Sequence, residues 1–135
     1  MANILIAAHD ETLRHLLGTA LRRFDHDVIM SVNGKHILDL IQKDIFDLAI
    51  IDENLQDTTA LEILEQVGGH LGLSVKYMVM SSKSSADVIR GYIESGATGF
   101  VLKPFSLPKV VTRIESILNS KPAPKVMRAE EYKAS

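Results

Sequence analysis

Five short apolar runs alternate along this chain with five stretches whose apolar residues recur at helical spacing. The runs are rich in Val, Ile and Leu and lack a strict polar alternation, which is typical of parallel strands buried on both faces. This order of elements predicts an α/β fold, a doubly wound five-stranded parallel sheet with five helices and right-handed crossovers. It favours the flavodoxin-like strand order 2-1-3-4-5. The expected strands are Asn3–Ala8, Asp27–Val32, Asp47–Ile51, Val75–Met80 and Thr98–Leu102.

Local signals mark the starts of several helices. Thr59 with Glu62 has the spacing of a capping box. Ser84 and Ser106 are placed to cap two later helices. The first helix is expected to carry its apolar stripe on Leu13, Leu16, Leu17, Ala20, Leu21 and Phe24.

Length and composition indicate one globular domain. The chain has 135 residues, of which 46% are apolar and 24% charged. We expect the domain to span residues 1–120 and a linker or flexible C-terminal tail to span residues 121–135, where Pro122 and Pro124 interrupt the periodic pattern. The side chains of four histidines are expected to be solvated: His15, His26, His36 and His70.

Charge and hydropathy exclude several classes of partner. The formal net charge of −2 and the absence of a basic patch with aromatics argue against direct binding of nucleic acid. No apolar stretch approaches the roughly 20 residues of a membrane span, and the N-terminus lacks a signal peptide. We therefore expect a cytoplasmic protein without membrane contact.

Three of the apolar runs are each followed by one polar residue, namely Asp52, Ser81 and Lys103. In an open parallel sheet, ligands bind in the crevice at the carboxyl ends of the strands. The sequence therefore predicts that a carboxylate, a hydroxyl and an ammonium group converge at one rim of the sheet.

These three residues lie in motifs that occur in a set order from Asn3 to about Asn119. The motifs are Phe46–Asp52, Asn54, Val79–Ser81, Gly96–Ala97 and Phe100–Phe105. In their order and separation they resemble the receiver domain of two-component response regulators.

The resemblance implies a role for each residue at the rim. Asp52 would accept a phosphoryl group, and Lys103 would hold a phosphoryl oxygen as a point charge. Ser81 would donate its hydroxyl to another oxygen, and Phe100 would change rotamer with the state of the site. A cis peptide bond between Lys103 and Pro104 would aim the lysine. Such a domain is a switch that at most phosphorylates itself, and not an enzyme.

The resemblance also implies a Mg²⁺ site, and here the sequence departs from the family. Asp52 and the backbone carbonyl of Asn54 would be ligands. The two adjacent acidic residues of the family correspond to Ala8 and His9, and imidazole suits transition metals better than Mg²⁺. Asp10 is a candidate replacement. We expect Mg²⁺ binding that is weak or absent.

Two functions therefore stay open. In the first, a histidine kinase or phosphotransfer protein supplies the phosphoryl group and a downstream protein or output domain reads the changed surface. In the second, a pseudo-receiver binds its partner without phosphorylation. A flavin-binding protein would need a Ser/Thr/Gly-rich phosphate loop after the first strand, and the acidic segment 9–12 argues against one. A homodimer also stays open, although Thr98 and Gly99 stand where DNA-binding members often carry the acidic pair that supports a dimer face, which argues against that face.

Overall fold

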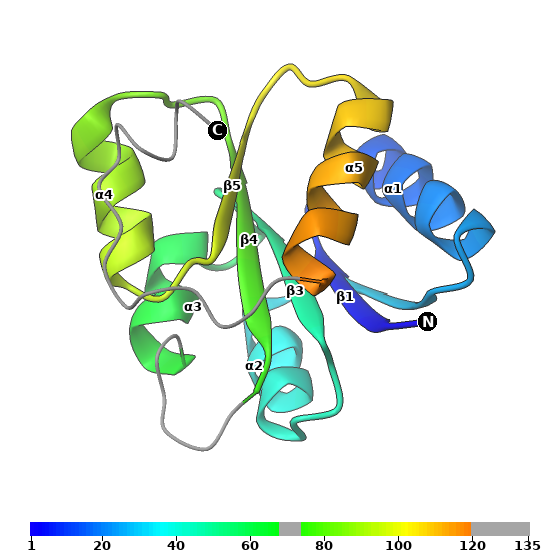
Figure 1. Cartoon of the computed structure of the whole chain (residues 1–135). Helices are drawn as coiled ribbons and strands as arrows, with labels where there is room; N and C mark the ends of the chain where they lie inside the picture. Colours follow the sequence, from blue (N-terminus) through cyan, green and yellow to red (C-terminus); the bar gives the residue numbers. More distant parts are fainter. Residues whose placement is uncertain (68–73, 120–135) are drawn as a thin grey trace.

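A parallel five-stranded sheet forms the centre of the molecule (Figure 1). The computed structural model describes residues 1–67 and 74–119, so His70 and the predicted tail lie outside the described residues. The strands are β1 (Asn3–Ala7), β2 (Asp27–Ser31), β3 (Leu48–Asp52), β4 (Lys76–Ser81) and β5 (Gly99–Leu102). All neighbouring pairs are parallel, in the order β2-β1-β3-β4-β5. The predicted fold class and strand order are confirmed.

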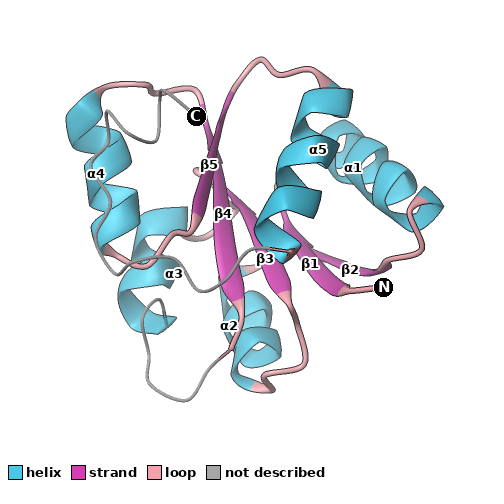
Figure 2. Cartoon of the chain, viewed as in Figure 1, coloured by secondary structure: helices cyan, strands magenta, loops and turns pink. Residues whose placement is uncertain are grey.

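Within the described residues, five helices cover the two faces of the sheet. They are α1 (Glu11–Arg23), α2 (Gly34–Gln42), α3 (Ala60–Val67), α4 (Ala86–Glu94) and α5 (Leu107–Leu118). Figure 2 shows α1 and α5 on one face and α2, α3 and α4 on the other. Ile4 and Ile6 of β1 pack toward α1 and α5, while Leu5 and Ala7 pack toward α2, α3 and α4. Both faces of β1 are buried, which explains its unbroken apolar run.

Two strands end one residue later than the sequence predicts. Asp52 pairs with Met80 across β3 and β4, and Ser81 pairs with Leu102 across β4 and β5. A polar side chain at a strand end does not prevent its backbone from joining the ladder. Asp52 and Ser81 are therefore the last residues of their strands, and Lys103 follows β5 directly.

The predicted helix starts need correction at two positions. Ser85, and not Ser84, caps α4, because its hydroxyl accepts the backbone N–H of Val88 at 3.3 Å. Ser106 lies at the N-cap of α5, but its side chain makes no capping hydrogen bond. At the start of α3 the predicted cap is present, since Thr59 accepts a backbone N–H at 3.2 Å.

The apolar stripe predicted for α1 is too wide. Leu17 and Leu21 are fully buried against the sheet, but Leu16 is 54% exposed and Phe24 is 55% exposed. Leu16 lies beside the buried row, and Phe24 is the C-cap residue, where the helix has already ended. Helical spacing alone does not separate the centre of an apolar stripe from its edges.

His26 is buried, contrary to the prediction of a solvated side chain. Its Nδ1 accepts the backbone N–H of Ala2 at 3.0 Å, and its Nε2 lies 2.6 Å from Oε1 of Glu115. The imidazole therefore joins the start of the chain to α5.

The loop between β3 and α3 rests on the start of α2. Asp57 accepts the backbone N–H of Gly34 at 2.8 Å. A β-carbon at Gly34 would overlap the methyl group of Thr58. Glycine is needed here because the side chains of Thr58 and Asp57 pack closely against its α-carbon. The contact holds the segment that follows Asp52.

None of the helices in residues 1–67 and 74–119 has the length and apolar character that crossing a bilayer requires.

Candidate functional site

Asp52 and Lys103 form an ion pair at the carboxyl ends of β3 and β5. Lys103 Nζ donates to Asp52 Oδ1 at 2.5 Å. Asp52 is only 5% exposed, so water screens this pair weakly. The peptide bond between Lys103 and Pro104 is cis, as the resemblance implied. The predicted convergence of carboxylate and ammonium is present.

Ser81 lies at the same rim, but its hydroxyl is committed to another residue. Its Oγ donates to Oε2 of Glu53 at 2.5 Å and accepts the backbone N–H of Lys83 at 3.0 Å. Ser81 is 0% exposed, and its carbonyl accepts the backbone N–H of Lys103 at 2.8 Å. Ser81 therefore lies next to the ion pair, but its hydroxyl donates its hydrogen bond to the carboxylate of Glu53.

Glu53 is the functional candidate that sequence reasoning missed. Besides Ser81, its carboxylate accepts the backbone N–H of Ser82 at 3.1 Å and the hydroxyl of Ser82 at 2.8 Å. Burial raises the pKa of Glu53, but the hydrogen bonds from Ser81 and Ser82 and the charge of Lys103 outweigh burial and lower it. Glu53 is therefore ionised at neutral pH.

A signal for Glu53 was present in the sequence. A glutamate directly follows Asp52, and two consecutive serines end the next strand. Hydroxyl groups at the end of a neighbouring parallel strand are natural donors to such a carboxylate.

Tyr92 of α4 lies beside Phe100 and near Ser81. Its ring centroid lies 6.0 Å from that of Phe100 with a tilt of 37°. Burial raises the pKa of Tyr92, and the charges of Glu53 and Asp52 raise it further, while the interaction with the side chain of Ser81 acts to lower it. Phe100 lacks a hydroxyl, so Tyr92 is the aromatic residue that reaches the polar rim.

The β1–α1 loop lies at the position of the family's acidic pair. Ala8 is fully buried, and His9 is exposed. The carboxylate of Asp10 caps α1 by accepting the backbone N–H of Leu13 at 3.0 Å. Arg14 Nη1 donates to the carbonyls of Ala8 and His9, both at 2.8 Å. The guanidinium group of Arg14 therefore binds the carbonyl oxygens of this loop.

The candidate ligand residues do not fit Mg²⁺, which prefers several oxygen ligands in octahedral geometry. No three His, Cys, Asp or Glu side chains gather as a metal site in the described residues. The carboxylate of Asp52 is bonded to Lys103, and that of Asp10 is bonded to its own helix. Asn54 is exposed, and its backbone forms an isolated antiparallel β-bridge with Thr59.

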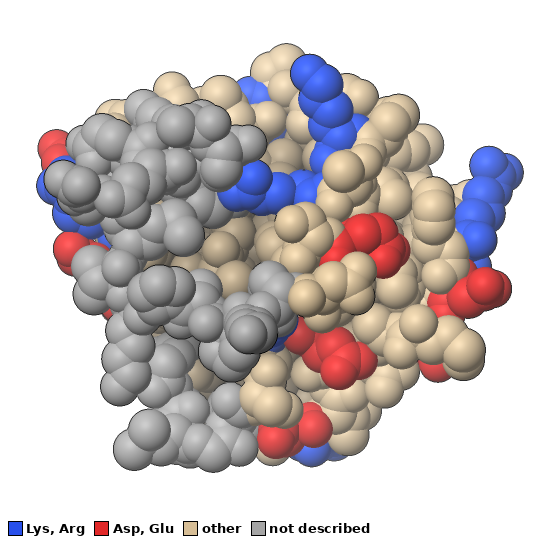
Figure 3. Space-filling model, viewed as in Figure 1, with Lys and Arg blue, Asp and Glu red and all other residues tan. Residues whose placement is uncertain are grey.

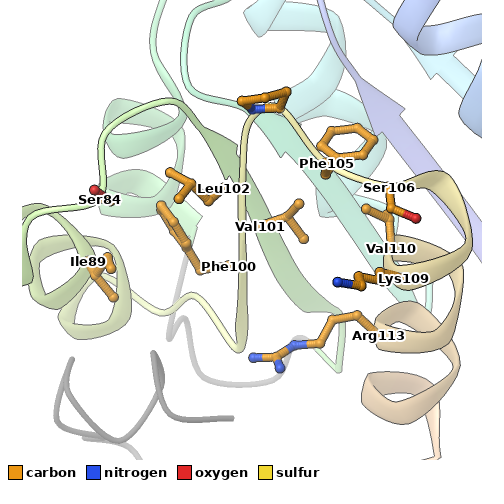
Figure 4. Close-up of a pocket in the computed structure, with 11 residues that line it drawn as sticks. Ser84, Ile89, Phe100, Val101, Leu102, Phe105, Ser106, Lys109, Val110 and Arg113 are labelled. Atoms are coloured by element: carbon orange, nitrogen blue, oxygen red, sulfur yellow. The ribbon is translucent and has the colours of Figure 1, made fainter.

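An open groove of about 600 Å³ lies between α4, β5 and α5. Figure 4 shows Ile89 and Phe100 on the α4 side of this groove. Lys109 and Arg113 point toward it from α5 (Figure 4). Lys and Arg side chains also gather over this part of the face in the space-filling view (Figure 3). The groove therefore has an apolar side formed by α4 and β5 and a basic side formed by α5.

Comparison with known proteins identifies relatives along nearly the whole chain. The model of the response regulator receiver domain family matches residues 4–115. The DNA-binding transcriptional regulator NtrC of Azospirillum brasilense is 28% identical over 133 residues, which are 98% of this chain and 27% of that protein. The response regulator ArlR of Staphylococcus saprophyticus is 26% identical over 123 residues, 90% of this chain and 54% of ArlR. The chain thus spans about a quarter to a half of these relatives.

Solved structures agree with the fold. The chemotaxis protein CheY4 of Vibrio cholerae has a TM-score of 0.78 at 22% identity, covering 87% of this chain and 98% of CheY4. The non-phosphorylated HemR receiver domain of Leptospira biflexa has a TM-score of 0.79 at 24% identity, covering 92% and 99%. Because the family model spans most of the residues and the fold agrees with it, the chain belongs to the response regulator receiver domains, the switch modules of two-component signal transduction.

Proposed function

We propose that the chain is a signalling switch that accepts a phosphoryl group on Asp52 from a histidine kinase or phosphotransfer protein. The observation that carries the proposal is the ion pair of Asp52 with Lys103 at 2.5 Å, on a rim where only 5% of Asp52 is exposed. Family membership supports the same role. A downstream protein or an output domain would read the altered surface.

The hydrogen bonds of Asp52 indicate which oxygen reacts. In the described part of the chain, Lys103 Nζ and the backbone N–H of Glu53 both donate to Oδ1, the latter at 2.9 Å. Oδ2 is therefore the oxygen available for attack on phosphorus. It would form the new P–O bond while the bond from phosphorus to the donor's leaving atom breaks. Lys103 would stay beside Oδ1 and neutralise charge on the transferred group.

Receiver domains typically bind Mg²⁺ in an acidic pocket, and the donors of this chain do not fit that ion. No step of the proposed reaction is therefore assigned to a metal. Lys103 and the backbone N–H of Glu53 are the groups of this chain that would stabilise the transferring phosphoryl group.

Incubation with acetyl phosphate in a Mg²⁺-containing buffer, followed by intact mass measurement, tests the proposal. We expect a mass gain of one phosphoryl group that Asp52→Asn abolishes. Asp39→Asn removes an exposed carboxylate on α2 and should label like the wild type. Lys103→Ala should slow labelling by about a hundredfold, since a preorganised charge at the reacting group is worth roughly that factor. No labelling of the wild-type chain would refute the proposed reaction.

A phosphorylation-independent interaction module is the second candidate. It is favoured by Ala8 and His9 at the acidic positions and by the bond that Glu53 makes to Ser81. The groove between α4, β5 and α5 would then bind a partner in the unmodified state. Asp52→Asn, tested for partner binding in cells, separates the candidates: unchanged binding supports the module, and lost binding in a folded variant supports the switch.

A further inference from the structure

Glu53 binds the last residue of β4 and the first residue of the β4–α4 loop through three hydrogen bonds. The donors are the hydroxyl of Ser81, the hydroxyl of Ser82 and the backbone N–H of Ser82, at 2.5, 2.8 and 3.1 Å. Glu53 is 9% exposed, so these bonds are largely shielded from water. Hydrogen bonds to an ionised carboxylate are about twice as strong as neutral ones. Glu53 therefore holds both serines.

The hydroxyl of Ser81 has no spare proton for a second acceptor. A serine hydroxyl carries one donor hydrogen and two acceptor lone pairs. The donor hydrogen goes to Glu53, because a carboxylate can only accept, and the backbone N–H of Lys83 occupies a lone pair at 3.0 Å. A phosphoryl oxygen on Asp52 could receive this proton only after Glu53 has released it.

We propose that Glu53 is a positioning residue that occupies the hydroxyl of Ser81 in place of a phosphoryl oxygen, and that it thereby slows phosphorylation of Asp52. The inference rests on the proposed function. The carboxylate keeps Ser81 directed inward while Asp52 is unmodified, and the β4–α4 loop is ordered before any phosphoryl group arrives.

The variant Glu53→Gln tests the inference, because it keeps the size and an acceptor oxygen but removes the charge. We expect it to raise the rate of labelling by acetyl phosphate about tenfold, the factor of one charge-assisted hydrogen bond made neutral. Glu94→Gln removes an exposed carboxylate from α4 and measures the effect of net charge alone. Thermal unfolding verifies that both variants fold.

A double-mutant cycle separates a positioning role from a structural one. If Glu53 acts through the Ser81 hydroxyl, Glu53→Gln in a Ser81→Ala background should change the labelling rate by no more than about twofold beyond the Glu94→Gln control. An equal acceleration in both backgrounds, or a single-variant rate at or below that of the wild type, overturns the inference.

The outcomes for the two proposals are distinguishable. A wild-type chain that labels at the same rate as Glu53→Gln refutes the inference and leaves the phosphoryl-acceptor function intact. A wild-type chain that does not label while Glu53→Gln does supports the inference and refutes phosphorylation of the natural chain. Absence of label on both chains refutes both proposals.

Discussion

Two buried tyrosines differ in whether their hydroxyl groups have a polar neighbour. Tyr77 of β4 is 3% exposed, and its hydroxyl has no hydrogen-bond partner in the part of the chain that the structure describes. Tyr92 is also buried, but its hydroxyl interacts with the side chain of Ser81. A buried hydroxyl without a partner loses its hydration without compensation. The two residues form a matched pair for testing what a polar neighbour contributes at a buried hydroxyl.

Tyr77→Phe should raise the free energy of unfolding by about 1 kcal/mol, since it removes an uncompensated polar group and keeps the ring. Tyr92→Phe should lower it by up to about 1 kcal/mol, because the interaction of this hydroxyl with Ser81 is lost. Urea unfolding monitored by circular dichroism measures both values. A destabilised Tyr77→Phe variant would show that the hydroxyl has a partner after all.

Tyr77 also predicts how stability depends on alkaline pH. Burial, with a smaller contribution from the charge of Asp44, raises the pKa of Tyr77 from 10.0 to about 12. Between these values the folded state keeps a proton that the unfolded state has lost, so the free energy of unfolding falls as pH rises from 10 to 12. Urea unfolding at several pH values should give a shallower fall for Tyr77→Phe than for the wild type. Equal slopes would contradict the assignment.

For single residues, the sequence predicted which side chains lie at the rim better than it predicted their hydrogen-bond partners. Asp52, Ser81 and Lys103 were predicted at one rim because the ends of parallel strands meet there, and the ion pair of Asp52 with Lys103 is present. The partner of Ser81 was not predicted, since a hydroxyl can donate in several directions and strand order does not choose among them. Glu53 could be recognised only once its distance to both serines was known.

The helices begin where short side chains can accept backbone N–H groups, but not every such residue does so. Asp10 accepts the backbone N–H of Leu13, whereas Ser106 makes no side-chain cap bond at the corresponding position of α5. The sequence predicted a cap at Ser106 and a metal-ligand role for Asp10. A serine before a helix marks a preference, and the rotamer that realises the cap depends on local packing.

Asp10→Ala should lower the free energy of unfolding by about 1 kcal/mol through loss of the α1 cap, whereas Ser106→Ala should change it by less than about 0.5 kcal/mol. Asp10→Asn retains a capping oxygen and should stay near the wild-type value. Chemical denaturation of the three variants makes the comparison. An Asp10→Ala variant as stable as Ser106→Ala would argue against the cap.

Across the whole molecule, the pattern of apolar residues was enough to predict the fold. Hydrogen bonds between residues far apart in the sequence could not be predicted from it. The five strand segments were recognised from unbroken apolar runs, because burial on both faces leaves a strong pattern. His26 gives no such pattern, since its partners Ala2 and Glu115 come from opposite ends of the domain. Such a pairing is fixed by tertiary structure alone.

His26→Ala should lower the free energy of unfolding by about 2 kcal/mol, because it leaves the partly buried N–H of Ala2 and one oxygen of Glu115 without their partner. A double-mutant cycle with Glu115→Gln should give a coupling energy of about 1 kcal/mol between the two side chains. Equilibrium unfolding in urea supplies all four free energies. Strict additivity would show that the 2.6 Å contact adds nothing to stability.

Gly34 links α2 to the loop that continues from Asp52. The helix contains none of the rim residues, yet its first residue supports that loop. Adding one methyl group at Gly34 would press on the side chain of Thr58, so a substitution in a remote helix would act on the loop beside the rim. Under the proposed function, sequence changes on α2 would thus tune phosphorylation of Asp52 while every rim residue stays the same.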